Sequence, residues 1–351
     1  MSTKAGRGGQ WMGTAALGRR DVLKIGVSVA AAAPLLAACG EDSPEGTVAW
    51  RSGTINPTVP DGFVLMCVEK GYLEEEGLDV TFTSSNSSEL VRAAVSNRLD
   101  IILLAPGSGF AAQEAGSDVK MVGVPWNKVR DFIYATSDIT SATDLVGKSI
   151  AIQAPNTSSE ILVSAVLERF GISADQVDMV QTGGDSERIA ALLSGRVDAT
   201  VAGIENLPVI EQDPNFTTVL SVGEIVPDVL GAAWFSTGRV IGERPEDLTK
   251  VLRAYTRGLR YALDHLDEAT AVAVERLRTA PEDEAVVAAA IQAHRDNQII
   301  NPNLNWTDQQ VAATQQLNVD IGSQNGVLPP EEVADRRFAD EVIGELGEYE
   351  W

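Results

Sequence analysis

Small and polar residues form two pairs of short segments that could hold a solute, and the members of each pair lie about 98 residues apart. Residues 84–88 (SSNSS) and 183–186 (GGDS) each precede a helix-like sequence. Residues 105–109 (APGSG) and 203–207 (GIENL) each follow a short apolar run. Helix N-termini offer free N–H groups, and small residues let a solute approach the backbone closely. These segments therefore predict reversible binding of a small molecule.

Two further segments and two tryptophans complete the set of candidate ligand contacts. Residues 154–159 (APNTSS) and 52–57 (SGTINP) follow strand-like sequences, and a tryptophan in a cleft can stack on a planar ligand. The neutral donors suit an anion, whereas a glutamate suits an amine or a protonated ring. The predicted contacts are Thr54, Asn56, Asn86, Ser87, Gly107, Ser108, Trp126, Asn156, Thr157, Ser158, Gly184, Asp185, Glu205 and Trp234.

The paired segments flank an internal repeat. Residues 88–100 (SELVRAAVSNRLD) and 186–198 (SERIAALLSGRVD) align without a gap and share six identical positions. A self-match at this spacing is too long for a solenoid repeat of about 20 to 50 residues, and it fits two homologous lobes that enclose a cleft. With Asn86 or Gly184 as N-cap, Glu89 and Glu187 fall where a carboxylate caps the first helical turn. We therefore expect the glutamates and arginines of the repeat to be structural.

The elements around these segments alternate between strand and helix. Strands are predicted at 47–51, 78–83, 101–104, 119–124, 149–153, 177–181 and 199–202, and helices at 62–70, 88–97, 158–170 and 187–194. This order predicts a mainly parallel sheet covered by helices in each lobe. From residue 245 onward five helices are predicted, at 245–265, 268–279, 282–297, 308–321 and 330–344, and we expect them to pack onto the first lobe.

These elements predict two doubly wound α/β lobes. The first lobe is expected to comprise residues 47–130 and 236–351, and the second residues 131–235. Residues 131–136 and 231–237 are predicted to be the strands that join the lobes.

The N-terminus resembles a bacterial export signal. A basic start precedes Arg19-Arg20, an apolar run from Ile25 to Ala38 and then Cys39. The run of about 14 residues is short for a membrane span. Residues 18–24 (GRRDVLK) resemble the twin-arginine motif and 36–39 (LAAC) a lipobox, which implies a signal peptide at 1–38, a lipid on Cys39 and a tether at 39–46. Only Cys67 then remains beside Cys39, so no internal disulfide is expected.

The composition excludes some classes of partner. A formal charge of −23 at pH 7 disfavours binding to nucleic acid, which proteins contact through Lys and Arg. No HExxH, GxSxG or P-loop motif is present, so neither catalytic residues nor a metal nor a cofactor is expected.

Three phrases of the sequence together resemble the substrate-binding lipoproteins of ABC importers, in the SsuA/THI5-like group that includes nitrate, sulfonate, taurine and thiamine-pyrimidine-precursor binders. They are residues 71–82 (GYLEEEGLDVTF), 87–116 (SSELVRAAVSNRLDIILLAPGSGFAAQEAG) and 146–173 (VGKSIAIQAPNTSSEILVSAVLERFGIS). The resemblance implies a type II periplasmic-binding-protein fold, hinge closure around a small ligand, and delivery to a membrane permease. A monomer on the extracytoplasmic face of the cell membrane is expected.

Two other functions stay open. Pyrimidine-synthesising relatives in this group use a histidine and a cysteine-rich motif, but the chain has only His265 and His294 and no cysteine cluster, which disfavours the enzyme. A ligand-sensing lipoprotein that signals through a membrane partner would share the same sequence features.

Overall fold

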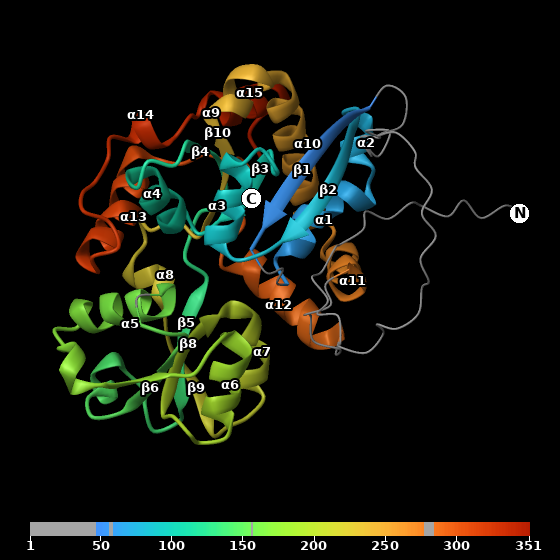
Figure 1. Ribbon diagram of the computed structural model, residues 1–351. Helices are drawn as coiled ribbons and strands as arrows, with labels where there is room; N and C mark the ends of the chain where they lie inside the picture. Colours follow the sequence, from blue (N-terminus) through green and yellow to red (C-terminus); the bar gives the residue numbers. More distant parts are fainter. Residues whose placement is uncertain (1–46, 56–58, 156, 277–283) are drawn as a thin grey trace, which may run out of the picture.

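The computed structural model describes residues 47–55, 59–155, 157–276 and 284–351, which form two α/β lobes (Figure 1). The predicted signal peptide, Cys39 and the tether lie outside the described residues. The strands of the first lobe are β1 (Val48–Thr54), β2 (Leu78–Ser84), β3 (Ile101–Leu104), β4 (Val119–Trp126) and β10 (Ala232–Thr237). Those of the second lobe are β5 (Asp131–Thr136), β6 (Ser149–Ile152), β7 (Asp178–Gln181), β8 (Ala199–Gly203) and β9 (Phe216–Ser221).

The two sheets have the same topology. Their strand orders are β2-β1-β3-β10-β4 and β7-β6-β8-β5-β9, and β1, β2 and β3 correspond to β6, β7 and β8. In each sheet one strand is antiparallel to its neighbours, β10 in the first and β5 in the second. Both antiparallel strands arrive from the other lobe along the chain. The sheets are therefore mainly parallel, as predicted, and each contains one strand that follows a crossing between lobes.

Helices cover both faces of the sheets. Those that follow the first-lobe strands are α1 (Asp61–Glu69), α2 (Tyr72–Glu75), α3 (Ser87–Val95), α4 (Pro106–Glu114) and α9 (Gly238–Glu243). The second lobe has η1 (Ala142–Leu145), α5 (Ser158–Arg169), η2 (Ala174–Gln176), α6 (Asp185–Leu193), η3 (Ile204–Asn206), α7 (Leu207–Glu211) and α8 (Val222–Ile225). The C-terminal helices are α10 (Pro245–Asp264), α11 (Leu266–Arg276), α12 (Glu284–Asp296), α13 (Asp308–Asp320), α14 (Pro330–Val333) and α15 (Arg337–Leu346).

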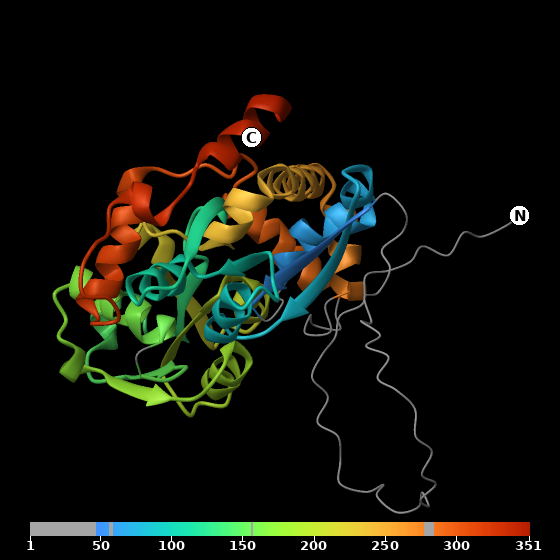
Figure 2. The same ribbon diagram turned by 45° about the horizontal axis from the view of Figure 1, so that its top comes forward.

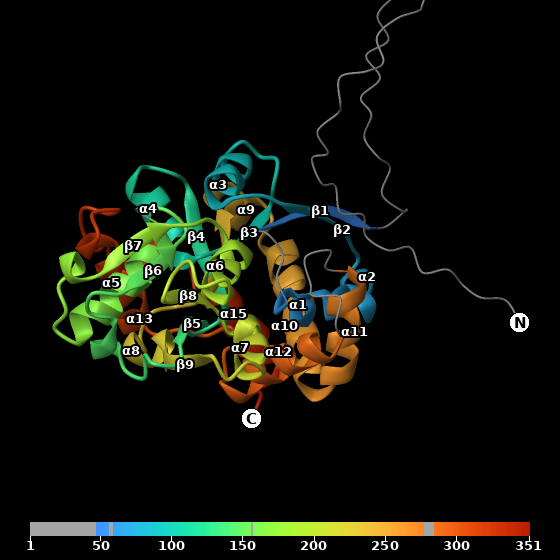
Figure 3. The same cartoon turned by 90° about the horizontal axis from the view of Figure 1, so that it is seen from below.

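The apolar cores of the lobes differ in form. The first lobe has one continuous cluster, which includes four buried tryptophans, Trp50, Trp126, Trp234 and Trp306. In the second lobe the sheet separates two clusters, with α5 on one face and α6 and α7 on the other (Figure 3). On the first lobe α10 crosses α1 so closely that a Cβ on Gly258 would lie 2.6 Å from the Cys67 nitrogen. The C-terminal helix α15 lies on α10 (Figure 2).

The internal repeat supplies one conserved contact to each lobe. Asp100 accepts a hydrogen bond of 2.9 Å from the backbone N–H of Arg51, and Asp198 accepts one of 2.8 Å from that of Ser149. The backbone bonds run the other way as well, from Asp100 to the Arg51 carbonyl and from Asp198 to the Ser149 carbonyl. Both pairs are separated by 49 residues, so Asp100 joins the start of β3 to β1, and Asp198 joins the start of β8 to β6.

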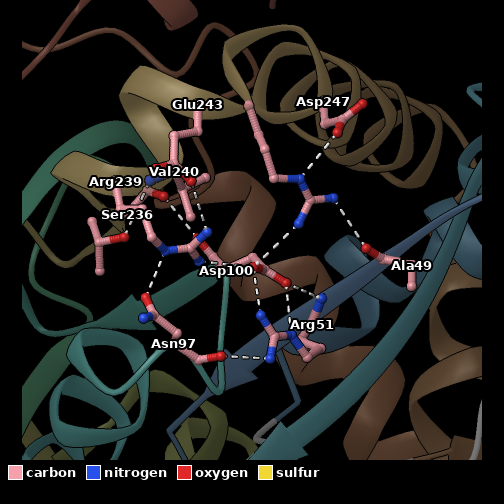
Figure 4. A network of polar contacts seen from close by, with 11 residues as sticks. Ala49, Arg51, Asn97, Asp100, Ser236, Arg239, Val240, Glu243 and Asp247 are labelled. Atoms are coloured by element: carbon pink, nitrogen blue, oxygen red, sulfur yellow. Dashed lines mark hydrogen bonds and ion pairs between the residues drawn. The ribbon is translucent and has the colours of Figure 1, made fainter. Parts of the chain in front are cut away.

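Asp100 has further partners that Asp198 lacks. Its buried carboxylate contacts the guanidinium groups of Arg51 at 2.8 Å, Arg244 at 3.3 Å and Arg239 at 3.6 Å (Figure 4). Asp198 instead accepts from the Ser149 hydroxyl at 2.7 Å. The first lobe therefore concentrates three cations on a carboxylate whose counterpart in the second lobe has a neutral partner.

Two chain segments cross between the lobes side by side. Residues 127–130 lead from β4 to β5, and residues 226–231 lead back toward β10. The Gly231 N–H donates to the Trp126 carbonyl at 3.0 Å, and a Cβ on Gly231 would lie 2.0 Å from the Lys128 carbonyl oxygen. Residue 231 therefore has no room for a side chain at the point where the crossings touch.

The C-terminal helices contact both lobes, which differs from the expectation that they pack onto the first. α10, α11 and α15 do pack there. α12, however, lies against η3 and α7, and α13 lies against α4 of the first lobe and α5 of the second. Ala293 and Leu317 reach the second-lobe clusters. Helical periodicity marks an apolar face, but it does not say which lobe that face meets.

Some elements were not predicted or have other bounds. α4 begins at Pro106, inside the segment 105–109 for which no helix was predicted, because proline suits the first helical position. The strand β9 and the short helices α2, α7, α8 and α9 were not predicted, and the helix expected at 330–344 is divided into α14 and α15.

Candidate ligand-binding site

A cavity of about 800 Å³ lies between the lobes. Its walls come from α3 and α4 of the first lobe, from β5, α5 and α6 of the second, and from α13. Six of the predicted contacts line it, three from each lobe. They are Ser87, Gly107, Ser108, Thr157, Ser158 and Asp185.

The first wall is formed by the N-termini of two helices. Asn86 caps α3, because its side chain accepts from the Glu89 N–H at 3.0 Å, as predicted. α4 begins after Ala105, which has no capping side chain. The Asn318 amide donates to the Gly107 carbonyl at 2.7 Å and fixes this turn against α13. The start of α4 therefore presents the Gly107 N–H and the Ser108 hydroxyl at the cavity wall, because Pro106 has no N–H and the Ser108 N–H donates to the Ala105 carbonyl at 3.0 Å.

The facing wall of the second lobe is the start of α5. Thr157 is the N-cap, but its hydroxyl donates to the Ala154 carbonyl at 2.6 Å instead of capping the helix. The Ser159 hydroxyl accepts from the Gln153 N–H at 2.8 Å. These bonds leave the Ser158 hydroxyl and the backbone N–H groups of Ser158 and Ser159 as polar groups of this wall.

A charged cluster occupies the adjacent part of the second lobe, where α6 begins and β8 ends. Arg188 is buried, and its guanidinium donates to the carbonyls of Val201 and Gly183, each at 2.9 Å. It also forms an ion pair with Asp185, whose other oxygen accepts from the Gly203 N–H at 3.1 Å. The Arg188 side chain therefore has a fixed position with three partners.

Arg130 and Glu205 form the second ion pair of the cluster. Burial opposes the charge of Arg130, but the carboxylates of Glu205, Asp131 and Asp185 outweigh it and raise the arginine pKa. Burial likewise works against the Glu205 carboxylate, yet Arg130 and, to a smaller extent, His294 hold its pKa below the ordinary value. The pair is therefore ionised.

Asp131, the first residue of β5, lines the cavity beside both pairs. Burial, the largest cause, raises its pKa to about 6. The carboxylates of Asp185 and Glu205 raise the pKa as well, whereas the guanidinium of Arg130 lowers it. His294 of α12 interacts electrostatically with Glu205, and its side chain is fully buried. Burial lowers the His294 pKa to about 4, so the imidazole is neutral at pH 7.

Six predicted contacts within the described residues do not line the cavity, and two more cannot be placed. Asn56 and Asn156 lie outside the described residues. The Asn86 side chain caps α3, Gly184 is the N-cap of α6, and Glu205 is paired with Arg130. The others lie in the first lobe: Trp126 is 4% exposed in its core, and Thr54 and Trp234 line a separate, much smaller pocket under Tyr255. Burial keeps both tryptophan rings from the cavity, since the first-lobe core encloses them.

Several cavity residues were missed by the sequence analysis. Arg130 and Asp131 adjoin a predicted crossing strand, but nothing marked their side chains as polar cavity walls. Arg188 did carry a signal, because it aligns with Leu90 in the repeat and an arginine at a buried repeat position calls for an explanation. No sequence pattern marked the cavity residues of α13, because they reach the cavity only through the packing of a helix that is distant in the sequence. They are Thr314, Leu317 and Asn318.

Within the part of the chain that the structure describes, no group of three or more His, Cys, Asp or Glu residues is arranged to hold a metal ion. The same residues include no helix long and apolar enough to cross a membrane.

Comparison with known proteins identifies the family. The sequence model described as NMT1/THI5 like matches residues 62–269. The chain belongs to the NMT1/THI5-like family. It is 27% identical over 223 residues to the formylaminopyrimidine-binding protein of Halalkalibacterium halodurans, which covers 61% of this chain and 66% of that protein.

A second relative is named as an enzyme. The chain is 25% identical over 222 residues to the 4-amino-5-hydroxymethyl-2-methylpyrimidine phosphate synthase of Candida albicans, covering 58% of this chain and 63% of that protein. The matches thus span less than two thirds of the length of these curated relatives.

The fold of this family member is that of periplasmic binding proteins. The aliphatic sulphonate binding protein SsuA from Escherichia coli superposes with a TM-score of 0.68 at 17% identity, covering 84% of this chain and 93% of that one. The predicted fold class is therefore confirmed.

Proposed function

We propose that this chain is an extracytoplasmic solute-binding protein, which captures a small polar solute between its lobes and delivers it to an ABC importer permease. The observation that carries the proposal is the cavity of about 800 Å³ whose polar groups come from helix N-termini of both lobes. A ligand that contacts both walls favours the closed arrangement of the lobes, and two adjacent crossings at Gly231 provide a hinge.

The cavity supports binding more than catalysis. Among the described residues no histidine or cysteine lines it, and the thiol of Cys67 is buried in the first-lobe core. Its two arginines are held in ion pairs. We therefore propose that the bound solute leaves unchanged, although one family relative is a synthase.

A variant with a blocked cavity tests this proposal. Ser158→Trp places an indole on the α5 wall, and Ser137→Trp places one on an exposed turn of the same lobe. A metabolite extract is incubated with each protein, and the bound solute is identified by native mass spectrometry. The solute is expected to be retained, chemically unchanged, by the Ser137→Trp protein and to bind the Ser158→Trp protein at least about tenfold more weakly. Equal affinity of both variants would place the ligand elsewhere, and conversion of the solute would favour the enzyme.

The lipid anchor and export route form a separate part of the proposal. Cys39→Ser is expected to release the protein from the membrane fraction, and replacement of Arg19 and Arg20 by lysine is expected to retain it in the cytoplasm. Co-purification with a permease would support transport, whereas co-purification with a membrane sensor would support a signalling lipoprotein.

A further inference from the structure

The charged cluster in the cavity contains one more carboxylate than guanidinium groups. The guanidinium of Arg188 is paired with Asp185, and that of Arg130 with Glu205. Asp131 is the third carboxylate of the cluster, and within the described residues neither a hydrogen bond nor an ion pair within 4 Å engages its side chain. With all five groups ionised, the cluster has one negative charge in excess.

We propose that Asp131 is the specificity-determining contact of the site and that it binds a cationic, hydrogen-bond-donating group of the solute, such as a protonated amine or amidine. This inference rests on the proposed solute-binding function and goes beyond it by naming the chemistry of the ligand. Asp131 lines the cavity, so a ligand group can reach it directly.

The cluster is poorly suited to anchor an anion. An anionic group placed here would add a second uncompensated negative charge to a site that already has one. Arg188 is not free to receive it, because its guanidinium is committed to Asp185 and to two carbonyl groups. A cation, by contrast, neutralises the excess charge and satisfies a half-buried carboxylate.

The uncapped helix N-termini lie on other walls of the same cavity. Those of α4 and α5 present N–H groups and hydroxyls, which donate hydrogen bonds to electronegative atoms of a ligand. The α6 N-terminus is already compensated by Asp185 at its first position. A solute with a positive nitrogen at Asp131 and acceptor atoms toward α4 and α5 would therefore use every polar wall.

The environment of Asp131 makes this contact sensitive to pH. The charged groups that face it are Arg130, Asp185, Arg188 and Glu205, with neutral His294 on the far side of Glu205. Burial raises the Asp131 pKa to about 6. Because a cation binds the ionised form, affinity is expected to fall about tenfold between pH 7.5 and pH 5.

The test uses pairs of similar probes in which only the first member has a cationic nitrogen: taurine and isethionate, γ-aminobutyrate and butyrate, benzamidine and benzamide. Calorimetry is carried out on the wild-type protein, on Asp131→Asn and on Asp175→Asn, an exposed carboxylate of the same lobe. In at least one pair the member with the cationic nitrogen (taurine, γ-aminobutyrate or benzamidine) is expected to bind about tenfold more tightly. Asp131→Asn is expected to abolish this preference and the pH dependence, and Asp175→Asn to keep both.

Other outcomes separate the inference from the function on which it rests. Tighter binding of the uncharged or anionic member in every pair overturns the cation contact, and so does an unchanged preference in Asp131→Asn. If none of the six probes binds while a neutral or anionic solute recovered from extract binds in the cavity and tolerates Asp131→Asn, the inference fails and the proposed function stands. If no solute of any charge binds, the proposed function fails.

Discussion

The first lobe places Leu90 in its core at the repeat position where the second lobe places Arg188. Both side chains are buried, and both helices begin one turn earlier, at the cavity. Both lobes also keep the repeat aspartate, which joins β3 to β1 in the first lobe and β8 to β6 in the second. The difference teaches where the duplicated scaffold was free to change. The aspartate contacts between strands are shared, whereas this buried helix position is apolar in the first lobe and charged, at the cavity, in the second.

The largest effect is expected from making the second lobe resemble the first. Arg188→Leu leaves Asp185 and the carbonyls of Gly183 and Val201 without their donor. Removal of a buried guanidinium that donates to two carbonyls and pairs with a partly exposed carboxylate is expected to lower the free energy of unfolding by about 3 to 5 kcal/mol, measured by urea denaturation. Arg196→Leu, at an exposed arginine of the same repeat, is the control and should change it by less than about 0.5 kcal/mol. Equal losses in the two variants would contradict a special role for Arg188.

The two aspartates of the repeat, Asp100 and Asp198, should also contribute unequally to the free energy of unfolding. Asp100→Asn removes the charge from a buried carboxylate with three arginine partners, and about 3 kcal/mol of unfolding free energy is expected to be lost. Asp198→Asn removes a carboxylate held by the backbone N–H and hydroxyl of Ser149, and about 1 kcal/mol is expected. The same bonds, from the backbone first and then the hydroxyl, lower the Asp198 pKa, so its contribution is present above about pH 4 and is lost in stronger acid. Thermal unfolding of both variants at pH 7 and pH 3 measures the contrast.

Two groups of the second-lobe site should act on stability in opposite directions. Burial raises the pKa of Asp131 from 3.8 to about 6, so the folded protein binds more protons there than the unfolded chain between pH 4 and 6, and this contribution to stability falls as pH rises. Burial lowers the pKa of His294 from 6.5 to about 4, so the unfolded chain binds more protons, and this contribution rises over the same range.

Single substitutions should separate the two contributions. Asp131→Asn is expected to increase the unfolding free energy of the ligand-free protein by about 1 to 2 kcal/mol at pH 7.5 and to change it little at pH 4. His294→Gln is expected to reduce the loss of stability on acidification from pH 7 to pH 4. Urea denaturation across this range measures both, and a parallel shift of either curve at all pH values would argue against titration as the cause.

The smallest effect is expected at the start of the repeat helices. The first begins with an asparagine cap and the second with Gly184, which has no side chain to cap with. Asn86→Gly makes the first lobe resemble the second and should cost only a few tenths of a kcal/mol, whereas Asn86→Ala should cost about 1 kcal/mol. Thermal unfolding compares the two variants, and an unchanged stability of Asn86→Ala would indicate that the Asn86 side chain contributes nothing through its bond to Glu89.

The sequence predicted the features that depend on local order and missed those that depend on packing between distant segments. The cap at Asn86, most strands and the cavity position of Ser108 and Ser158 followed from the repeat and from helix starts. The partner of Glu205 did not, because an ion pair between residues 75 positions apart leaves no spacing pattern. The Asp185–Arg188 pair does have the i,i+3 spacing of a helical ion pair, and the sequence analysis overlooked it. The prediction placed Trp126 and Trp234 in the cavity, whereas the core of the first lobe encloses them. A tryptophan near a crossing looks the same in the sequence whether it packs in a core or lines a cleft.

The unequal placement of the buried tryptophans has an optical consequence. Trp50, Trp126, Trp234 and Trp306 all belong to the core of the first lobe, and residues 131–229 contain no tryptophan. Indole emission therefore reports on that lobe, while far-ultraviolet dichroism reports on the whole backbone. If the lobes unfold together, the two signals change at the same urea concentration; if the second lobe opens first, the dichroism changes while the emission stays native.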